Sequence, residues 1–173
     1  MSFEQQLNTI YQKIGQKVND IIPVDWEEFY FNGEVENGEG GVFFFFKEKD
    51  KANEYIYSHD IPDSYSFVEE REYHQEIHEL FKLVNDLQEV FIKNNQEKWF
   101  SINMIVNAQG QLKIDFCCNN WNLSDFGPSS RIDYFEYKYL NKKPTNNEEK
   151  KLMEQMKNFE KTTSYFDSEG GIC

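Results

Sequence analysis

The stretch "DWEEFYFNGEVENGEGGVFFFFKEKD", residues 25–50, contains four consecutive phenylalanines, Phe43 to Phe46. Turn-forming Asn, Gly and Glu residues at its middle predict two antiparallel strands joined by a short turn. Successive side chains of a strand point to opposite faces of the sheet, so two of the four rings leave the core that the other two fill. The first face, which we expect to form that core, carries Phe29, Phe31, Val35, Val42, Phe44 and Phe46.

The opposite face of the predicted sheet combines aromatic and polar side chains. We expect it to carry Tyr30, Phe43, Phe45, Ser101, Asn103, Asp115 and Cys117. This mixture is too aromatic for a surface that only meets water and too polar for an ordinary core. Either the last two helices of the chain cover this face, or a partner protein does, because large aromatic patches with polar rims commonly mark interaction sites.

Helices are predicted where apolar residues recur at steps of three and four. The first such pattern runs from Phe3 to Ile21, after Ser2 as N-cap, and a longer one runs from Tyr73 to Phe91. Two more helices are expected over residues 131–140 and 144–161. For the longer helix, Asp63 or Ser64 is the predicted cap of the entry turn.

Three further strands complete the predicted sheet. "NEYIYSHDIP", residues 53–62, reads as a short strand that ends at Pro62, and residues 99–118 alternate as a hairpin around "NAQG". The order is therefore α-β-β-β-α-β-β-α-α, which predicts an α+β fold with an antiparallel sheet of about five strands packed against helices. We treat residues 1–162 as one domain and residues 163–173 as a loose C-terminal tail.

The charge of the chain excludes one class of partner and favours another. Its 173 residues carry a formal net charge of −13, with 31 acidic against 18 basic residues. Nucleic-acid binders need clustered Lys and Arg, so we predict no nucleic-acid partner, whereas a basic protein would be attracted. No apolar run approaches the length of a membrane span, no signal peptide begins the chain, and the cysteines lack a framework spacing. We therefore expect a cytoplasmic protein with no membrane partner.

The strongest candidate for catalysis is the pair His74 and His78 in "HQEIH". Zinc proteases place two histidines at this spacing, but they need Glu directly after the first, and Gln75 stands there. A small metal-dependent or acid/base enzyme that uses this pair is the alternative function. No nucleophile motif such as G-x-S-x-G is present. We predict no catalytic residue, no metal site and no cofactor.

Several stretches in order resemble one family. They are "IYQKI", "IIPVDWEEFYF", "GEGGVFFFF", "YIYSHDIP", "WFSINMIVNAQGQLKIDF" and "NNWNLSDFGPSSR". Over about residues 3–160 the chain resembles the YezG-type antitoxins, also called EsaG-like immunity proteins, of Gram-positive bacteria. The resemblance implies a non-enzymatic cytoplasmic protein. Its partner would be the nuclease domain of a toxin exported by a type VII-like secretion system.

The residues that would bind this cognate secreted nuclease toxin are predicted from the patterns alone. Tyr30, Phe43 and Phe45 are the expected aromatic anchors. Three carboxylates would interact with basic groups of the toxin, and Trp121 would lie in the loop beside them. The carboxylates are Glu36, Asp115 and Asp125.

Overall fold

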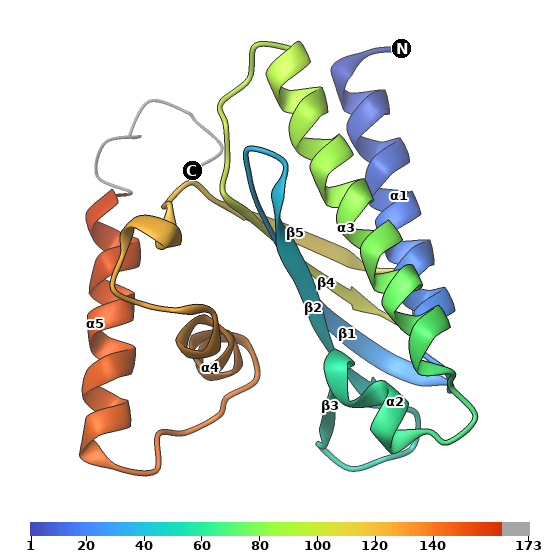
Figure 1. Cartoon of the computed structure of the whole chain (residues 1–173), viewed down its shortest axis with the longest axis vertical. Helices are drawn as coiled ribbons and strands as arrows, with labels where there is room; N and C mark the ends of the chain where they lie inside the picture. The colour runs from blue at the N-terminus through green and yellow to red at the C-terminus, as the bar shows by residue number, and fades with distance from the viewer. Residues whose placement is uncertain (164–173) are drawn as a thin grey trace. The chain divides into compact units, whose positions relative to one another are not determined.

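The computed structural model describes residues 1–163 of the chain (Figure 1). Contacts between residues divide the chain into two compact units, residues 1–116 and residues 117–173. Each unit is described by itself below.

The first unit is one antiparallel sheet with helices, in the strand order β3-β2-β1-β4-β5. The strand order places β1 at the centre of the sheet. Its elements are α1 (Phe3–Ile21), β1 (Trp26–Glu36), β2 (Glu39–Glu48), β3 (Tyr55–Tyr57), the 3₁₀ turn η1 (Ser58–Asp60), α2 (Ile61–Ser64), α3 (Glu70–Lys93), β4 (Ser101–Asn107) and β5 (Leu112–Cys117). The predicted α+β class and the order of the main elements are confirmed.

The hairpin of β1 and β2 forms where the quoted stretch predicts it. Asn37 and Gly38 both have positive φ angles, 52° and 81°, which a two-residue turn between strands with right-handed twist requires. The register that follows pairs Phe31 with Phe44. The first face of the sheet is therefore a continuous apolar layer, and all six of its predicted side chains are buried.

Helices α1 and α3 lie side by side (Figure 1), and α3 also contacts β1 and β2. Ser2 caps α1 in a capping box with Gln5, as predicted. The buried Gln88 of α3 donates from Nε2 to the carbonyl oxygens of Val35 at 3.1 Å and Trp99 at 2.7 Å. One side chain of α3 thus satisfies backbone carbonyls at the end of β1 and just before β4.

The segment after β2 differs from its prediction. The third strand has only three residues, and Ser58 to Ser64 form the turn η1 and the short helix α2. Pro62 lies in the first turn of α2, where its fixed φ and missing N–H suit a helix start, so it does not end a strand. Since Ser64 ends α2, neither it nor Asp63 caps α3, and the side chain of Glu69 does so by accepting from the Glu72 N–H.

The second unit contains the two predicted C-terminal helices, α4 (Pro128–Tyr139) and α5 (Asn147–Thr163), preceded by the 3₁₀ turn η2 (Trp121–Leu123). Trp121 packs on Phe159 of α5 with ring centroids 4.7 Å apart and on Tyr134 of α4 at 5.7 Å. Asn119 donates to the carbonyl oxygen of Glu160 at 2.9 Å. This unit thus has an aromatic core of its own.

The assignment of residues 1–162 to one domain stays a prediction. So does the loose tail over residues 163–173, because residues 164–173 lie outside the described residues and Thr163 is the last residue of α5. Within residues 1–163, no helix combines the length and the apolar character that crossing a bilayer requires.

Candidate partner-binding surface

Strands β1 and β2 bring the predicted aromatic anchors together on the second sheet face, which we define by Tyr30, Asn32, Phe43, Phe45, Tyr55, Tyr57 and Asn103. The register aligns Tyr30 of β1, Phe45 of β2 and Tyr57 of β3 in one row across the sheet. Alternation on each strand then places their neighbours two residues away on the same face. The strand register therefore determines which side chains share this face.

The rings of this face form two contacting groups, which the pairing of Tyr30 with Phe45 places next to each other. Phe45 lies 5.1 Å from Tyr57 and 6.0 Å from Phe43, and Tyr30 meets Tyr55 edge-to-face at 5.7 Å, all between ring centroids. These separations are in the range in which aromatic pairs attract beyond simple burial. Phe45 is buried with 4% exposure, while the other four rings are half-buried. The strands therefore hold the five rings as one group.

The side of this face toward β4 is polar and buried. Asn32 Nδ2 donates to Asn103 Oδ1 at 2.8 Å across the β1–β4 pair, and Ser101 is buried on the same face. Asn32 Oδ1 is itself buried and has no hydrogen-bond partner within residues 1–163. A buried acceptor without a partner costs free energy, so this amide is a group that a further donor would satisfy.

Charged residues gather at the end of the hairpin that begins β1. The Lys47 ammonium lies 2.8 Å from a carboxylate oxygen of Glu27, and the hydrogen bond from Lys47 lowers the pKa of Glu27 below its usual value. Tyr55 donates from its hydroxyl to Glu28. Burial and, second to it, the charge of Glu28 raise the pKa of Tyr30 above its usual value.

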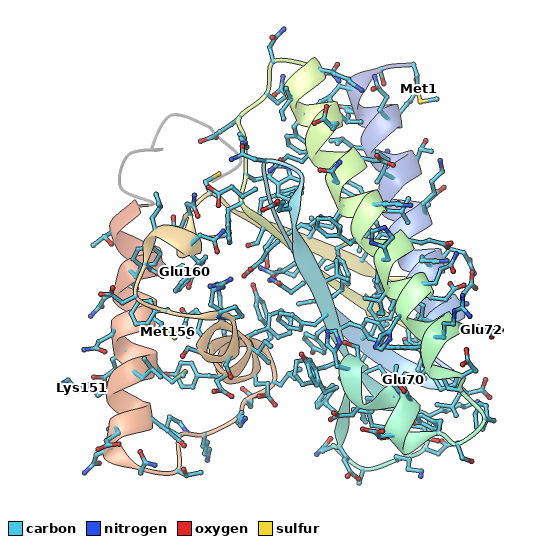
Figure 2. All side chains as sticks on the ribbon, in the orientation of Figure 1. Met1, Glu70, Glu72, Lys151, Met156 and Glu160 are labelled. Carbon is cyan, nitrogen blue, oxygen red and sulfur yellow. The ribbon has the colours of Figure 1, made fainter. Side chains whose placement is uncertain are left out.

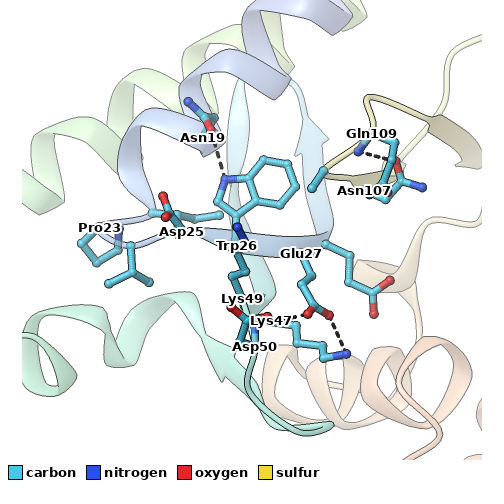
Figure 3. Close-up of a pocket in the computed structure, with 14 residues that line it drawn as sticks. Asn19, Pro23, Asp25, Trp26, Glu27, Lys47, Lys49, Asp50, Asn107 and Gln109 are labelled. Atoms are coloured by element: carbon cyan, nitrogen blue, oxygen red, sulfur yellow. Dashed lines mark hydrogen bonds and ion pairs between the residues drawn. The ribbon is translucent and has the colours of Figure 1, made fainter.

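Glu27, Glu28 and Lys47 also line an open pocket of about 1070 Å³ (Figure 3). Figure 3 shows Trp26 between α1 and the charged residues, and its Nε1–H donates to Asn19 Oδ1 at 3.1 Å. Glu27 and Lys47 lie below it, joined by their ion pair. The pocket is polar and contains carboxylates of the first unit, which suits contact with basic groups.

The remaining predicted site residues lie elsewhere. Glu36 ends β1 and is half-buried, and Asp115 lies on β5 with a carboxylate oxygen 3.6 Å from Lys113 Nζ. Trp121 and Asp125 belong to the second unit, where Trp121 is buried in the aromatic core and Asp125 is exposed. The structure therefore brings together Tyr30, Phe43 and Phe45, while the residue set as a whole stays a prediction.

Alternation along β1 places Asn32 on the same face as Tyr30, but sequence reasoning missed Tyr55 and Tyr57 as members of this face. The two tyrosines lie on this face because β3 pairs with β2, with Tyr57 opposite Phe45 and Tyr55 opposite Lys47. A three-residue strand gives too short a pattern to fix that register from sequence.

The histidine pair of the alternative function lies on the exposed surface of α3. Within residues 1–163, no group of three or more His, Cys, Asp or Glu side chains is placed to hold a metal ion. The aromatic face is therefore the better candidate for a functional site.

Comparison with known proteins decides the family. The model of the YezG-like immunity proteins matches residues 7–154, which include the whole sheet, α4 and part of α5. The chain belongs to the YezG-like immunity protein family.

Relatives agree with this assignment over most of their length. The chain is 32% identical over 139 residues to immunity protein YezG of Bacillus spizizenii, covering 80% of this chain and 85% of the relative. It is 30% identical over 138 residues to the type VII secretion system protein EsaG of Staphylococcus aureus, covering 80% and 83%. The YezG protein of Bacillus subtilis is 30% identical over 147 residues, covering 85% and 96%. Membership supports an immunity role for this YezG-like chain.

Proposed function

We propose that this protein is a cytoplasmic antitoxin that binds and neutralises the nuclease domain of a toxin secreted by a type VII-like system. The family supports the immunity role, and the relative named EsaG is a type VII secretion system protein. The observation that carries the proposal for the site is the five-ring cluster on the second sheet face. Tyr30, Phe43 and Phe45 act as its anchors.

The charge distribution supports a basic partner. Residues 1–116 contain 22 acidic and ten basic residues, a net charge of −12, while residues 117–173 contain nine and eight, a net charge of −1. Almost all of the acidic excess therefore lies in the unit that carries the sheet. A nuclease domain is basic where it holds DNA, so opposite charges would draw the two proteins together.

Neutralisation proceeds by binding and not by chemistry. Aromatic anchors that are buried in an interface contribute most of its affinity, and carboxylates at its edge set the rate of encounter and the orientation. In this complex Glu36 and Asp115 of the first unit meet basic groups of the toxin, and Asp125 and Trp121 of the second unit are further proposed contacts.

Co-purification with the secreted toxin encoded beside this protein's gene tests the function. We expect a stable complex and loss of nuclease activity at equimolar protein. Replacing Tyr30 and Phe43 by alanine should weaken binding by at least tenfold, about 1.4 kcal/mol or more. The exposed pair His74→Ala and His78→Ala serves as the matched control and should bind as the wild type does. Absence of binding at micromolar concentration would overturn the proposal.

A further inference from the structure

Among the Phe, Tyr and Trp side chains of residues 1–163, only Phe67 is exposed. Its exposed fraction is 70%, while the other Phe, Tyr and Trp rings of this part of the chain are buried or half-buried. A large apolar side chain that the fold leaves in water is unused by the core. Phe67 lies in the loop between α2 and α3 and is not one of the rings that define the second sheet face.

The fold holds this exposed ring in place. Tyr65 accepts the Val68 N–H at 3.0 Å, and its own N–H donates to the Ile61 carbonyl at 3.0 Å, so the loop is a closed turn. The Tyr65 ring stacks on the fully buried Phe46 at 6.5 Å and meets the Phe67 ring edge-to-face at 5.9 Å. Phe67 therefore rests on a residue anchored in the core, and little conformational freedom remains to be lost on binding.

The surroundings of Phe67 are strongly acidic. No lysine occurs between Lys51 and Lys82, and residues 52–81 contain eight acidic residues against Arg71 alone. This gives a net charge of −7 with neutral histidines, more than half of the −13 of the chain. Figure 2 labels Glu70 and Glu72 at the first turn of α3, beside α2. The exposed acidic residues within seven positions of Phe67 in the sequence are Asp60, Asp63, Glu69, Glu70 and Glu72.

We propose that residues 60–72, the Phe67 surface, form a second contact site for a basic protein, with Phe67 as the anchor in an apolar recess of that partner. This inference rests on the proposed function, since the partner is the toxin. Phe67 is an exposed aromatic side chain that the fold holds in place, and the residues near it in sequence are negatively charged. This matches the arrangement of an apolar anchor and a charged rim in an interface. The same charge repels nucleic acid and a second copy of this chain, which leaves a lysine- or arginine-rich protein surface as the occupant.

The test measures binding kinetics of the full-length protein with the toxin domain encoded beside its gene. We expect Phe67→Ala to raise Kd at least tenfold, mainly through faster dissociation. Ile92→Ala is the matched control, because it removes an exposed apolar side chain at a different place, on α3. This variant should leave Kd unchanged. The circular dichroism spectra and the unfolding midpoints of both variants should match those of the wild type, because each side chain is exposed.

A charge variant tests the rim separately. Neutralising Asp63, Glu70 and Glu72 together as D63N/E70Q/E72Q should slow association several-fold at low salt and flatten its salt dependence. Asp86, Glu89 and Glu97 are also exposed, so D86N/E89Q/E97Q removes the same total charge elsewhere and should have a smaller effect.

The outcomes separate this inference from the proposed function. If the wild-type protein does not bind the toxin, the proposed function is wrong and the Phe67 surface loses its partner with it. If the wild type binds and both Phe67→Ala and the rim variant bind as well as their controls, only the Phe67 surface is overturned.

Discussion

Gly33 of β1 lies directly against Val84 of helix α3. A Cβ atom built on Gly33 would lie 2.8 Å and 3.0 Å from the two methyl carbons of Val84, which is fully buried. No side chain larger than hydrogen fits between them without displacing the valine. The position of α3 over the sheet therefore depends on one missing methyl group.

Gly33→Ala is expected to lower the free energy of unfolding by about 1–3 kcal/mol, because overpacking forces Val84 or the backbone to shift. Urea denaturation measures this loss. Gly41→Ala on β2 is the matched control, since a Cβ atom there meets nothing within 4 Å. Equal stability of the two variants would show that the helix and the sheet adjust freely at Gly33.

Gln88 illustrates what the sequence hides at this scale. It borders an apolar stripe that predicts α3 well, yet nothing in that stripe shows that a glutamine is buried. Its role comes from two carbonyl oxygens, of Val35 and Trp99, that lie far from it in sequence. Buried backbone carbonyls need donors, and only the assembled fold shows which side chain supplies them.

At the scale of elements, strong periodicity predicted the long helices and strands. Sequence patterns did not predict the short elements that follow one another within a few residues. Residues 25–50 gave the correct hairpin because alternation, a turn and a register all agree. Residues 53–69 contain a strand, two short helical turns and a loop, so no pattern lasts long enough to be recognised. For the same reason Tyr57 and Phe67 could not be predicted as surface features, whereas alternation alone placed Phe43 and Phe45 on the second face.

Lys17 links α1 to α3 through ion pairs with Glu76 and with Glu79, the latter at 2.6 Å. Burial lowers the pKa of Lys17, but its hydrogen bonds and charge interactions with these two carboxylates outweigh that effect and raise it. The hydrogen bond from Lys17 is the main cause that lowers the pKa of Glu79. The pairing therefore stabilises the packing of the two helices while both partners are charged.

Lys17→Met should reduce stability in a pH-dependent way. A raised lysine pKa contributes stability below the unfolded value of 10.5, and a lowered glutamate pKa contributes it above the unfolded value of 4.5. The difference between wild type and variant should thus be present near neutral pH and shrink below pH 4.5. Urea midpoints from pH 3 to pH 8 measure it. Lys13→Met, an exposed lysine of the same helix, should show no such trend.

At the scale of the whole molecule, the first unit contains a complete sheet, two long helices and a core of its own. Buried side chains of α1, α3 and the strands fill that core, among them Val18, Leu80, Phe91 and Ile102. The second unit has its separate aromatic cluster around Trp121. This division also separates the charge, since the acidic excess lies in the first unit.

A fragment of residues 1–118, which retains all of β5, is expected to fold alone. It should show the circular dichroism of a mixed α/β protein and one cooperative urea transition, because buried side chains of α1, α3 and the strands give it a hydrophobic core. The full chain measured in parallel is the reference. A fragment without a cooperative transition would support the assignment of residues 1–162 to one domain.

The strand order has a consequence for biosynthesis. Strand β1 lies between β2, which follows it at once, and β4, whose Asn103 is 71 positions beyond its neighbour Asn32. At ribosomal speeds of about 5–20 residues per second, β4 is synthesised roughly 4–14 s after β1, so β1 lacks its second neighbouring strand for that time. A protein with this topology gives β1 both of its neighbours only after residue 107 has been added, so the centre of the sheet forms in the second half of translation.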